Sequence, residues 1–486
     1  MTSSAGLAAF EARYAQGIAQ TVERRLSSDL DTPVSAFLKL AAPPAVLLES
    51  VEGGETLGRY SVIAWAPDRL WHSVGGRPEI QTNGGAFESD PRPLRESLAA
   101  FVDDARCATP QGAPPMTAGV FGYLGYDFAR EIEKLPPRKP SPADVPEAVF
   151  IRPTLVAIFD NVRHEILLST PARPKAGVSA QEAHADAVAR LDEAASLLSR
   201  PLEPMSAGSA LAGPVASNMS PTDYQAMAAR AREYIAAGDI FQVVLSQRFS
   251  APLAAPPFAL YRALRRVNPS PFLFYLDFGT HQLAGSSPEI LVRARDGVMT
   301  VRPIAGTRRR GRDAAEDAAN AEALLADPKE RAEHLMLLDL GRNDVGRVCR
   351  VGSVRVTESF AVERYSHVMH IVSNVEGALR DGVSALDALA AGFPAGTVSG
   401  APKIRAMEII DELERDGRGV YGGAVGYFAG DGSLDACIAL RTAIIKDGRM
   451  HVQAGAGIVA DSDPLAEHRE CEAKAAALFD AARSIG

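Results

Sequence analysis

The amino-acid sequence predicts an α+β fold. Three apolar segments near its C-terminal end, at 424–429, 437–445 and 450–458, follow one another directly. Turn signals separate them at Gly430-Asp431-Gly432 and at Asp447-Gly448, so the segments predict a meander of antiparallel strands. Antiparallel strands that are neighbours in sequence favour an α+β fold over a doubly wound α/β fold.

Length and composition are typical of a globular protein. The 486 residues are too many for one compact core, which predicts two or three domains or one large two-layer assembly. The net charge of −9 argues against a general nucleic-acid-binding protein. Apolar runs are too short to span a membrane, no secretory signal is visible, and the four cysteines form no CxxC pair. We therefore expect a cytoplasmic protein with reduced cysteines, no membrane association and no nucleic-acid partner.

A stretch rich in Pro, Ser, Gly and Ala at 199–221 is the strongest candidate for a linker. It divides the chain into an N-terminal region, 20–198, and a C-terminal region, 222–486. An Ala-rich segment with helical spacing of apolar residues, 181–198, comes directly before the linker.

Helices and strands alternate after the linker. Ser220 is the expected N-cap of a helix over 221–238, whose first residue is proline. Residues 240–249 alternate in the manner of a strand with two distinct faces. Two further strands are expected at 272–278 and 290–292.

The stretch 301–311 has the composition of an anion-binding turn. Four arginines flank Gly306-Thr307 directly after an apolar strand; they are Arg302, Arg308, Arg309 and Arg310. Arginine stays charged and forms paired hydrogen bonds with carboxylates, and glycine lets backbone N–H groups come close to a ligand. Taken alone, the stretch predicts either a site for a small multi-anionic ligand or a basic surface hairpin.

Two expected helices each carry a pair of glutamates three positions apart, which places each pair on one helix face. The pairs are Glu330 and Glu333 in the helix that begins at Asp327-Pro328, and Glu467 and Glu470 in the helix that begins at Asp463-Pro464. Carboxylate oxygens are the ligands that Mg²⁺ prefers. The spacing equally fits two solvated helix faces with ion pairs, which is its commoner meaning.

Two other segments could lie against a ligand. Residues 396–403 form a Gly/Ser/Thr turn before a helix, which either presents N–H groups to an anion or is an ordinary loop. Residues 454–457, Ala-Gly-Ala-Gly, end a strand shortly before the last helix, where a ligand could approach the backbone closely. His370 lies in a strand candidate, and a lone histidine is most often structural.

In their order, these segments resemble the chorismate-utilising enzymes, and among them anthranilate synthase component I, from about Thr32 to Ile485. The resemblance implies large, mainly antiparallel sheets packed as a sandwich with flanking helices. It also implies that Glu333 and Glu470 hold Mg²⁺, with Glu330 and Glu467 lining the same site. Positions that match the family's chorismate site are Gly306, Thr307, Tyr421, Arg441, Gly455, Ala456, Gly457 and Lys474. Positions that match residues of its chemistry are His370, Thr397, Glu333 and Gln242.

Two positions distinguish activities within this family. Gln242 stands where isochorismate and salicylate synthases carry a lysine that activates water, and Ala305 where aminodeoxychorismate synthases carry a nucleophilic lysine. Without either lysine, the resemblance implies attack of ammonia on C2 of chorismate, followed by loss of pyruvate to give anthranilate. Glu333 or a neighbouring carboxylic acid would protonate the leaving hydroxyl, and His370 would assist the second step.

The N-terminal region resembles the family's regulatory region. Leu47-Leu48-Glu49-Ser50 matches its tryptophan-inhibition motif, although the motif alone predicts only a strand that ends in a turn. Asn268-Pro269-Ser270-Pro271-Phe272-Leu273 matches the second wall of the same pocket. The residues expected to bind L-tryptophan are Leu48, Glu49, Ser50, Pro271, Phe272 and Leu273.

No glutaminase sequence follows the last expected helix. A separate glutamine amidotransferase subunit, component II, is therefore expected to supply ammonia within a heterodimer or heterotetramer. Three alternatives stay open. The product could be aminodeoxyisochorismate or aminodeoxychorismate, or the chain could be an inactive tryptophan-binding regulator. A Mg²⁺-dependent phosphoryl-transfer enzyme would need a phosphate cradle, and the sequence contains no P-loop.

Overall fold

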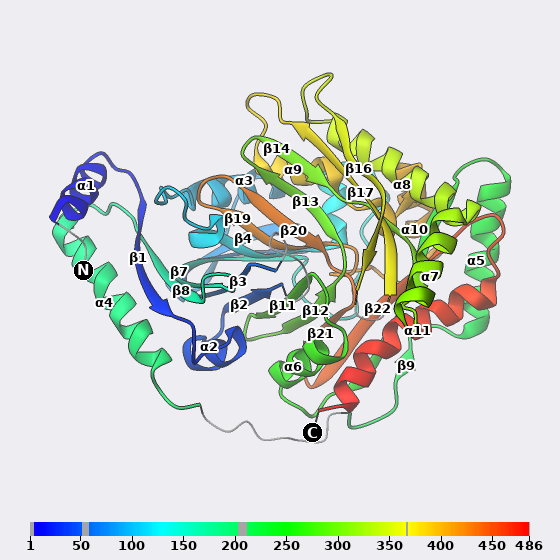
Figure 1. Cartoon of the computed structure of the whole chain (residues 1–486), viewed down its shortest axis with the longest axis horizontal. Helices are drawn as coiled ribbons and strands as arrows, with labels where there is room; N and C mark the ends of the chain where they lie inside the picture. The colour runs from blue at the N-terminus through cyan, green and yellow to red at the C-terminus, as the bar shows by residue number, and fades with distance from the viewer. Residues whose placement is uncertain (1–3, 51–57, 203–210, 366–367, 486) are drawn as a thin grey trace.

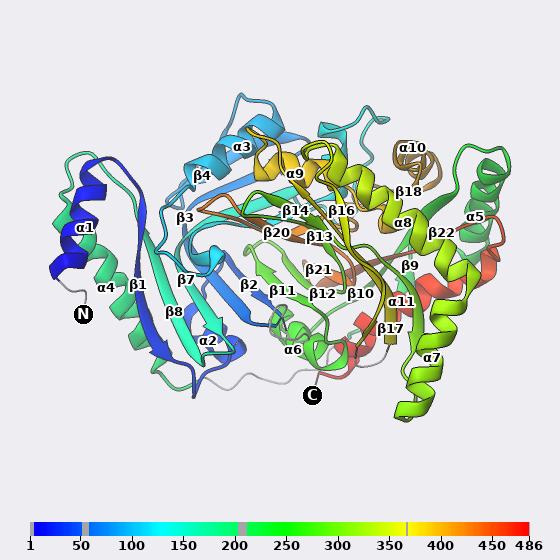
Figure 2. The same ribbon diagram turned by 45° about the horizontal axis from the view of Figure 1, so that its top comes forward.

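The computed structural model describes residues 4–50, 58–202, 211–365 and 368–485 (Figure 1). It confirms the α+β prediction. The named strands of these residues form one hydrogen-bonded network, and every pairing between them is antiparallel. Helices α1 (Ser4–Ala15) and α4 (Ala180–Leu198) lie at one end of the molecule and α5 (Pro221–Ala236) at the other, as Figures 1 and 2 both show.

Two long strands, β3 (Tyr60–Val74) and β7 (Ala148–Asp160), belong to both layers of the sheet network. They pair with each other along most of their length, with a register shift between Pro67 and Arg69. Before this shift β3 pairs with β2 (Ala45–Glu49), and after it with β4 (Arg77–Thr82). β3 and β7 thus pass from the first sheet into the second.

The first sheet continues on both sides of these two strands. Its further members are β1 (Gln20–Ser27), β8 (Glu165–Ala172), β11 (Phe272–Asp277), β12 (Gln282–Ser287), β21 (Thr442–Lys446), β22 (Arg449–Ile458), β10 (Gln242–Pro252), β9 (Ala216–Ser217) and β18 (Gly400–Ala401).

The second sheet extends from the other halves of β3 and β7. Its further members are β5 (Phe87–Ser89), β6 (Gly119–Leu124), β19 (Ala424–Ala429), β20 (Leu434–Ile438), β13 (Ile290–Arg295), β14 (Val298–Val301), β15 (Ile304–Arg309), β16 (Arg355–Arg364) and β17 (Val368–Ala378).

The two sheets face each other across a layer of strand side chains. Val46 and Phe274 of the first sheet lie in the same apolar cluster as Phe121 and Val425 of the second. Their neighbours along each strand point the opposite way, because strand side chains alternate between faces: Leu47, next to Val46, lies in the cluster beneath the outer helices. This arrangement confirms the expected sandwich with flanking helices.

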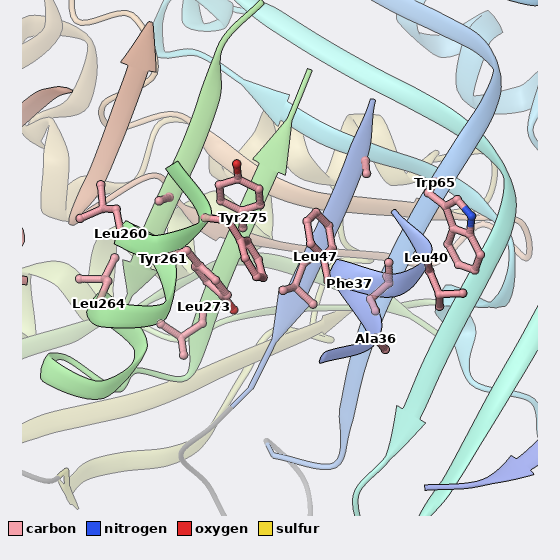
Figure 3. Packing of buried hydrophobic residues seen from close by; sticks show 14 of the residues in the cluster. Ala36, Phe37, Leu40, Leu47, Trp65, Leu260, Tyr261, Leu264, Leu273 and Tyr275 are labelled. Carbon is pink, nitrogen blue, oxygen red and sulfur yellow. The ribbon is translucent and has the colours of Figure 1, made fainter. Parts of the chain in front are cut away.

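Helices cover the outer faces of both sheets. Beneath the first sheet, α2 (Pro33–Leu40) and α6 (Pro257–Val267) pack Phe37 and Tyr261 against Tyr275 of β11 (Figure 3). The same sheet carries α1, α4 and α11 (Pro464–Arg483). The second sheet carries α3 (Leu94–Asp104), α8 (Pro328–Gly346) and α9 (Ala385–Gly392), while α10 (Lys403–Leu413) packs beside α5.

Helix starts follow the predicted caps. The Ser220 hydroxyl accepts a hydrogen bond from the Asp223 N–H at the start of α5, and Asp327 and Asp463 cap α8 and α11 in the same manner. Burial on both faces of β10 differs from the prediction, since Val243 and Val244 are both covered, whereas Phe241 is exposed before the strand begins. Helices α5, α10 and α11 cover the face of Val243 and Leu245, and the buried Glu414–Arg418 pair lies against Ser246 on the face of Val244, which explains this difference.

The expected meander is wrong in its middle strand. β19 and β20 form one hairpin and β21 and β22 another, but β20 belongs to the second sheet and β21 to the first. The chain changes sheet between Ile438 and Thr442, and Arg441 adopts a left-handed backbone conformation there (φ +47°). The sequence does not reveal such a crossing, because the segments on both sides are strands and share the same period-two apolar pattern.

Strand pairing crosses the predicted linker. β2 pairs with β11, and β6 pairs with β19, so each sheet combines strands from 20–198 and 222–486. The division into these two regions remains a prediction about sequence organisation, and residues 203–210 of the linker lie outside the described residues.

Two other features bear on the sequence-based expectations. All four cysteines are buried and unpaired. Within the described part of the chain, no helix is long and apolar enough to cross a membrane.

Candidate active site

A cavity of about 200 Å³ lies where the two sheets meet α11. The turn after β12, the crossing between β20 and β21, and strands β15, β17 and β22 form its wall. Seven of the predicted site residues line it: Thr307, His370, Thr397, Tyr421, Arg441, Gly455 and Lys474. The fold therefore brings together residues that are up to 167 positions apart, from 307 to 474.

Close contacts require glycine at Gly455 in this wall and at Gly306 and Gly457 beside it. A Cβ atom on Gly455 would lie 2.6 Å from the Tyr421 hydroxyl, and one on Gly457 would lie 2.7 Å from Nε2 of Gln242. Gly306 has a positive φ of +68° at a β-bulge against β17, and a Cβ there would lie 2.9 Å from Glu330. These glycines thus allow polar groups to approach the backbone.

The cations of the cavity are Arg441 and Lys474. The left-handed backbone at the sheet crossing carries Arg441 into the wall, and no described carboxylate forms an ion pair with it. Lys474 Nζ donates to the Gly455 carbonyl at 2.9 Å and pairs with Glu470 at 2.7 Å. Burial lowers the pKa of Arg441, which remains a cation at neutral pH.

The four arginines of 301–311 are not among the residues that line this cavity. Arg302 pairs with Glu358 and Glu363, Arg308 with Asp327, and Arg310 with Asp317. Arg308 follows Thr307 directly in β15, so its side chain points to the opposite face of the strand.

His370 is held as a neutral base. Its Nδ1 lies 2.9 Å from the Gly306 carbonyl and 3.1 Å from the Thr307 hydroxyl. A carbonyl only accepts, so Nδ1 carries the proton and Nε2 is unprotonated. Burial lowers the pKa of His370, with the Gly306 carbonyl opposing this effect and Arg441 adding to it.

Glu289 is a site residue that the sequence analysis missed. It lies fully buried in the cavity wall, where the Thr397 hydroxyl donates to its Oε2 at 3.0 Å. Burial raises the pKa of Glu289 to about 8, although the Thr397 hydrogen bond and the Ile304 N–H oppose this effect. In the sequence, a single carboxyl residue between a proline and the apolar run Ile290-Leu291-Val292 was the feature that could have indicated a buried acid.

The glutamate pairs of α8 and α11 lie beside the cavity. Gln242 Nε2 donates to Glu333 at 3.2 Å, and Lys329 of α8 pairs with Asp461, just before α11, at 3.2 Å. The pKa of Glu330 is raised by burial and by the charge of Glu333. The two helix starts are thus neighbours.

These carboxylates suit a hard cation in kind and in place. Mg²⁺ prefers carboxylate oxygens and retains several water ligands, so a few protein oxygens suffice. Among the described residues, no three acidic, His or Cys side chains already converge as in a metal site. Burial also raises the pKa of Glu467, with a further contribution from Glu470 that a Ser462 hydrogen bond opposes.

Comparison with known proteins identifies the family. Residues 44–480 match the family model described as chorismate binding enzyme. The chain belongs to the chorismate-binding enzymes. It is 52% identical to anthranilate synthase component 1 of Cereibacter sphaeroides over 98% of this chain and 97% of that protein.

Two solved structures extend this comparison. Anthranilate synthase component I from Streptococcus pneumoniae is 36% identical and superposes with a TM-score of 0.77, covering 94% of this chain and 99% of that one. The menaquinone-specific isochorismate synthase of Escherichia coli, 20% identical, shares the fold with a TM-score of 0.73, covering 99% and 100% of the two chains.

Five positions predicted for chorismate or its chemistry do not line the cavity of this chorismate-binding enzyme: Gln242, Gly306, Glu333, Ala456 and Gly457. The Ala456 side chain is fully buried among the residues that pack against α5 and α10. Gln242 lies behind Gly457, where it reaches Glu333. Any contact of Ala456 with a ligand would have to come from its backbone.

A second cavity, of about 280 Å³, lies between the two sheets. The residues predicted for tryptophan meet there because β2 and β11 are paired, with Leu273 opposite Glu49 and Phe274 opposite Leu48. All six predicted residues, Leu48, Glu49, Ser50, Pro271, Phe272 and Leu273, line it. The second sheet completes the wall with Arg293, Arg295, Tyr427, Asp435 and Cys437.

Ser50 and Glu49 differ in their surroundings. The Ser50 hydroxyl is buried and has no hydrogen-bond partner among the described residues. The Glu49 carboxylate accepts a hydrogen bond from Tyr261 and pairs with Arg265 at 3.2 Å. Burial raises the pKa of Glu49, which Arg265 and Tyr261 oppose. Among the described residues of this wall, the Ser50 hydroxyl and Nε of Arg295 are buried without a hydrogen-bond partner.

Proposed function

We propose that this chorismate-binding enzyme is an anthranilate synthase component I that aminates chorismate at C2 with ammonia and eliminates pyruvate. The observation that carries the proposal is the 52% identity, over nearly the full length of both chains, to a protein named anthranilate synthase component 1. The cavity residues described above support it with a chemistry for each step.

The two cations of the cavity wall would bind the substrate. Chorismate carries two carboxylates, and Arg441 and Lys474 are the cations that face the cavity. Arg441 can form a bidentate pair with one carboxylate. Gly455 lines the cavity, and its lack of a side chain lets the Tyr421 hydroxyl lie close to the backbone.

Loss of the ring hydroxyl requires an acid. Glu289 replaces Glu333 in this role, because Glu289 lies in the cavity wall and its pKa of about 8 keeps it protonated at neutral pH. Its proton would pass to the departing hydroxyl, which leaves as water while ammonia adds at C2. Thr397 positions the carboxyl group through its hydrogen bond.

Aromatisation requires a base. The unprotonated Nε2 of His370 is suited to remove the proton from C2 as the enolpyruvyl group departs as pyruvate. Neither Ala305 nor Gln242 offers an amine that could act as a nucleophile or activate water, which supports ammonia as the attacking group.

Mg²⁺ is the cofactor of this proposal. Glu333 and Glu470 would hold it, with Glu330 and Glu467 beside them, and it would neutralise a substrate carboxylate when bound. Glu470 pairs with Lys474, which lines the cavity, so the proposed metal site and the substrate wall are adjacent.

The second cavity is the proposed site for feedback inhibition by L-tryptophan. Phe272 and Leu273 provide apolar walls for an indole ring, and the free Ser50 hydroxyl offers a polar contact. A glutamine amidotransferase subunit, component II, is the proposed source of ammonia in the assembled enzyme.

The decisive experiment uses the purified chain with chorismate, Mg²⁺ and ammonium. We expect anthranilate and pyruvate in equal amounts, and no turnover with glutamine until component II is added. Isochorismate, salicylate or aminodeoxychorismate as the main product would contradict the proposal. Binding of tryptophan without any turnover of chorismate would instead identify the chain as an inactive regulator.

A further inference from the structure

We propose that Gln453 is a substrate-contacting residue whose amide oxygen is aimed into the chorismate cavity by a buried relay of three other residues. The inference rests on the proposed function and adds a hydrogen-bond acceptor to a wall whose cations are Arg441 and Lys474. Gln453 lies on β22 and lines the cavity beside Val452, Ala454 and Gly455.

The relay begins at a buried ion pair. Arg418 donates to both oxygens of Glu414, at 2.6 and 2.9 Å, and both side chains are almost fully covered. Arg418 also donates to the carbonyls of Val244 and Val398, each at 2.6 Å. Burial lowers the pKa of Arg418, but Glu414, Tyr126 and Tyr421 together outweigh this effect and raise it overall.

Ser246 connects this pair to Gln453. The Ser246 hydroxyl and N–H each lie 2.8 Å from Oε1 of Glu414. Nε2 of Gln453 lies 2.8 Å from the same hydroxyl. The relay therefore runs from Arg418 through Glu414 and Ser246 to Gln453.

The protons in this relay can be arranged in only one way. Glu414 is ionised against Arg418 and can only accept, so the single hydroxyl proton of Ser246 must point at Glu414. The Ser246 oxygen must then accept from Gln453, which requires the amide nitrogen to face Ser246. The amide oxygen of Gln453 is consequently turned away from the relay.

This orientation determines what Gln453 can bind. An amide oxygen repels carboxylates and accepts only from O–H or N–H groups. In the proposed reaction such groups are the ring hydroxyl of chorismate and the incoming ammonia. Gln453 thus recognises a hydrogen-bond donor on a reactant, whereas Arg441 and Lys474 recognise its anionic groups.

The relay also explains why polar groups are buried behind this wall. Apolar side chains of similar size would fill the same space without the cost of desolvating an ion pair. An ionised Glu414 is needed, however, to fix the direction of the Ser246 proton. A purely structural role would not depend on which end of the Gln453 amide faces the cavity.

The test is the Gln453→Met variant, which retains length and volume but lacks the acceptor. We expect the KM of one reactant to rise about ten-fold, as for loss of one hydrogen bond in a site that leaves its partner unpaired. A rise for chorismate, also seen in calorimetric binding of chorismate without ammonium, identifies the ring hydroxyl. A rise for ammonium alone identifies ammonia.

Two further variants separate positioning from structure. Gln282→Met is the matched control, because Gln282 is also a strand glutamine held through Nε2, by Asp277 at 3.1 Å, and lies outside the cavity. We expect both KM values and the melting temperature of this control to match wild type. Ser246→Ala should raise the same KM as Gln453→Met, and the double variant should be no worse than Gln453→Met alone.

Any one of three results would overturn the inference: unchanged KM values in Gln453→Met, equal changes in Gln282→Met, or independent effects of the Gln453 and Ser246 substitutions. A wild-type enzyme that turns chorismate into another product would instead refute the proposed amination. Chorismate binding to wild type and Gln453→Met still tests the acceptor in that case, and unchanged binding would overturn it.

Discussion

Glu289 has a raised pKa because its carboxyl group is buried between a proline and an apolar strand, and only the Thr397 hydroxyl and one backbone N–H stabilise its charge. We predict that Glu289→Gln lowers kcat by roughly 10²–10⁴-fold, the usual contribution of a general acid, without loss of the fold. Steady-state rates and circular dichroism check this. Glu322→Gln, at an exposed position on α7 (Ala314–Ala326), is the control, and similar rates for the two variants would contradict the role.

The same pKa predicts a pH dependence. Glu289 must be protonated to act as the acid, so kcat should be retained below about pH 8 and fall as the pH rises through that value. Thr397→Val removes a hydrogen bond that favours the charged form, so the alkaline fall should move to higher pH. A pH profile of kcat for both proteins measures this, and a fall at the same pH in both would argue against Glu289.

Ser50 permits a test of regulation that leaves the active site untouched. Ser50→Phe fills part of the 280 Å³ cavity, so tryptophan inhibition should be relieved with little change in the uninhibited rate. Anthranilate formation across a tryptophan titration measures the effect. Superimposable inhibition curves for wild type and variant would show that the motif 47–50 is structural.

At the scale of single residues, the sequence predicted which residues belong to the site better than it predicted where their side chains point. Thr307 and Arg441 line the cavity, whereas the four arginines around Gly306 do not, and three of them form ion pairs with Glu358, Asp327 and Asp317 instead. Glu289 and Gln453 were missed for a related reason. Neither lies in a motif of spaced polar residues, and each acts through a contact with a residue distant in the chain.

At the scale of secondary structure, the starts of helices α8 and α11 lie side by side, which places their two glutamate pairs near each other. Helices α8 and α11 both begin at an Asp-Pro cap, and their first turns are neighbours through Lys329 and Asp461. We predict that Glu333→Gln and Glu470→Gln each raise the Mg²⁺ concentration needed for half-maximal activity at least ten-fold, because one carboxylate ligand is lost at constant volume. Activity across a Mg²⁺ titration, after treatment with a chelator, measures this.

Controls for the metal prediction lie on the same helices. Asp339→Asn on α8 removes a charge at a position that is exposed and pairs only with Arg342. Its Mg²⁺ requirement should equal that of wild type. A Glu470→Gln enzyme with an unchanged requirement would mean that the glutamates are solvated helix faces, which was the alternative interpretation of their spacing.

The start of a helix was predictable from the sequence where a capping residue fixes it. The point where the chain passes from one sheet to the other was not. Helices α4, α5, α8 and α11 begin at or beside the predicted residue, because capping hydrogen bonds are local. The crossing at Ala439–Arg441 was missed, since its cause is the pairing of β20 with β13 and of β21 with β12. That crossing is also what delivers Arg441 to the cavity.

The whole molecule is expected to unfold as one unit. β2 pairs with β11 and β6 with β19, so the regions 20–198 and 222–486 share both sheets and their common core. We predict that urea gives a single transition, with tryptophan fluorescence and enzymatic activity lost together. The fluorescence reports the N-terminal region alone, since Trp65 and Trp71 are the only tryptophans of the chain and both are buried.

A separate fluorescence transition at lower or higher urea would support two independently stable regions. The sandwich architecture itself followed from the resemblance, whereas the sharing of strands between regions did not. Sequence composition marks a linker at 199–221, but it contains no information on which strands pair across it.

The shared strands have a consequence for biosynthesis. As the chain leaves the ribosome, β6 (Gly119–Leu124) is complete long before its partner β19 (Ala424–Ala429) exists. At ordinary translation rates the roughly 300 intervening residues take about 15–60 s to be made, and an apolar strand with an unpaired edge invites intermolecular pairing during that time. Slowed translation, or loss of the chaperones that shield nascent chains, should therefore reduce the yield of this protein more than that of a sandwich whose paired strands are adjacent in sequence.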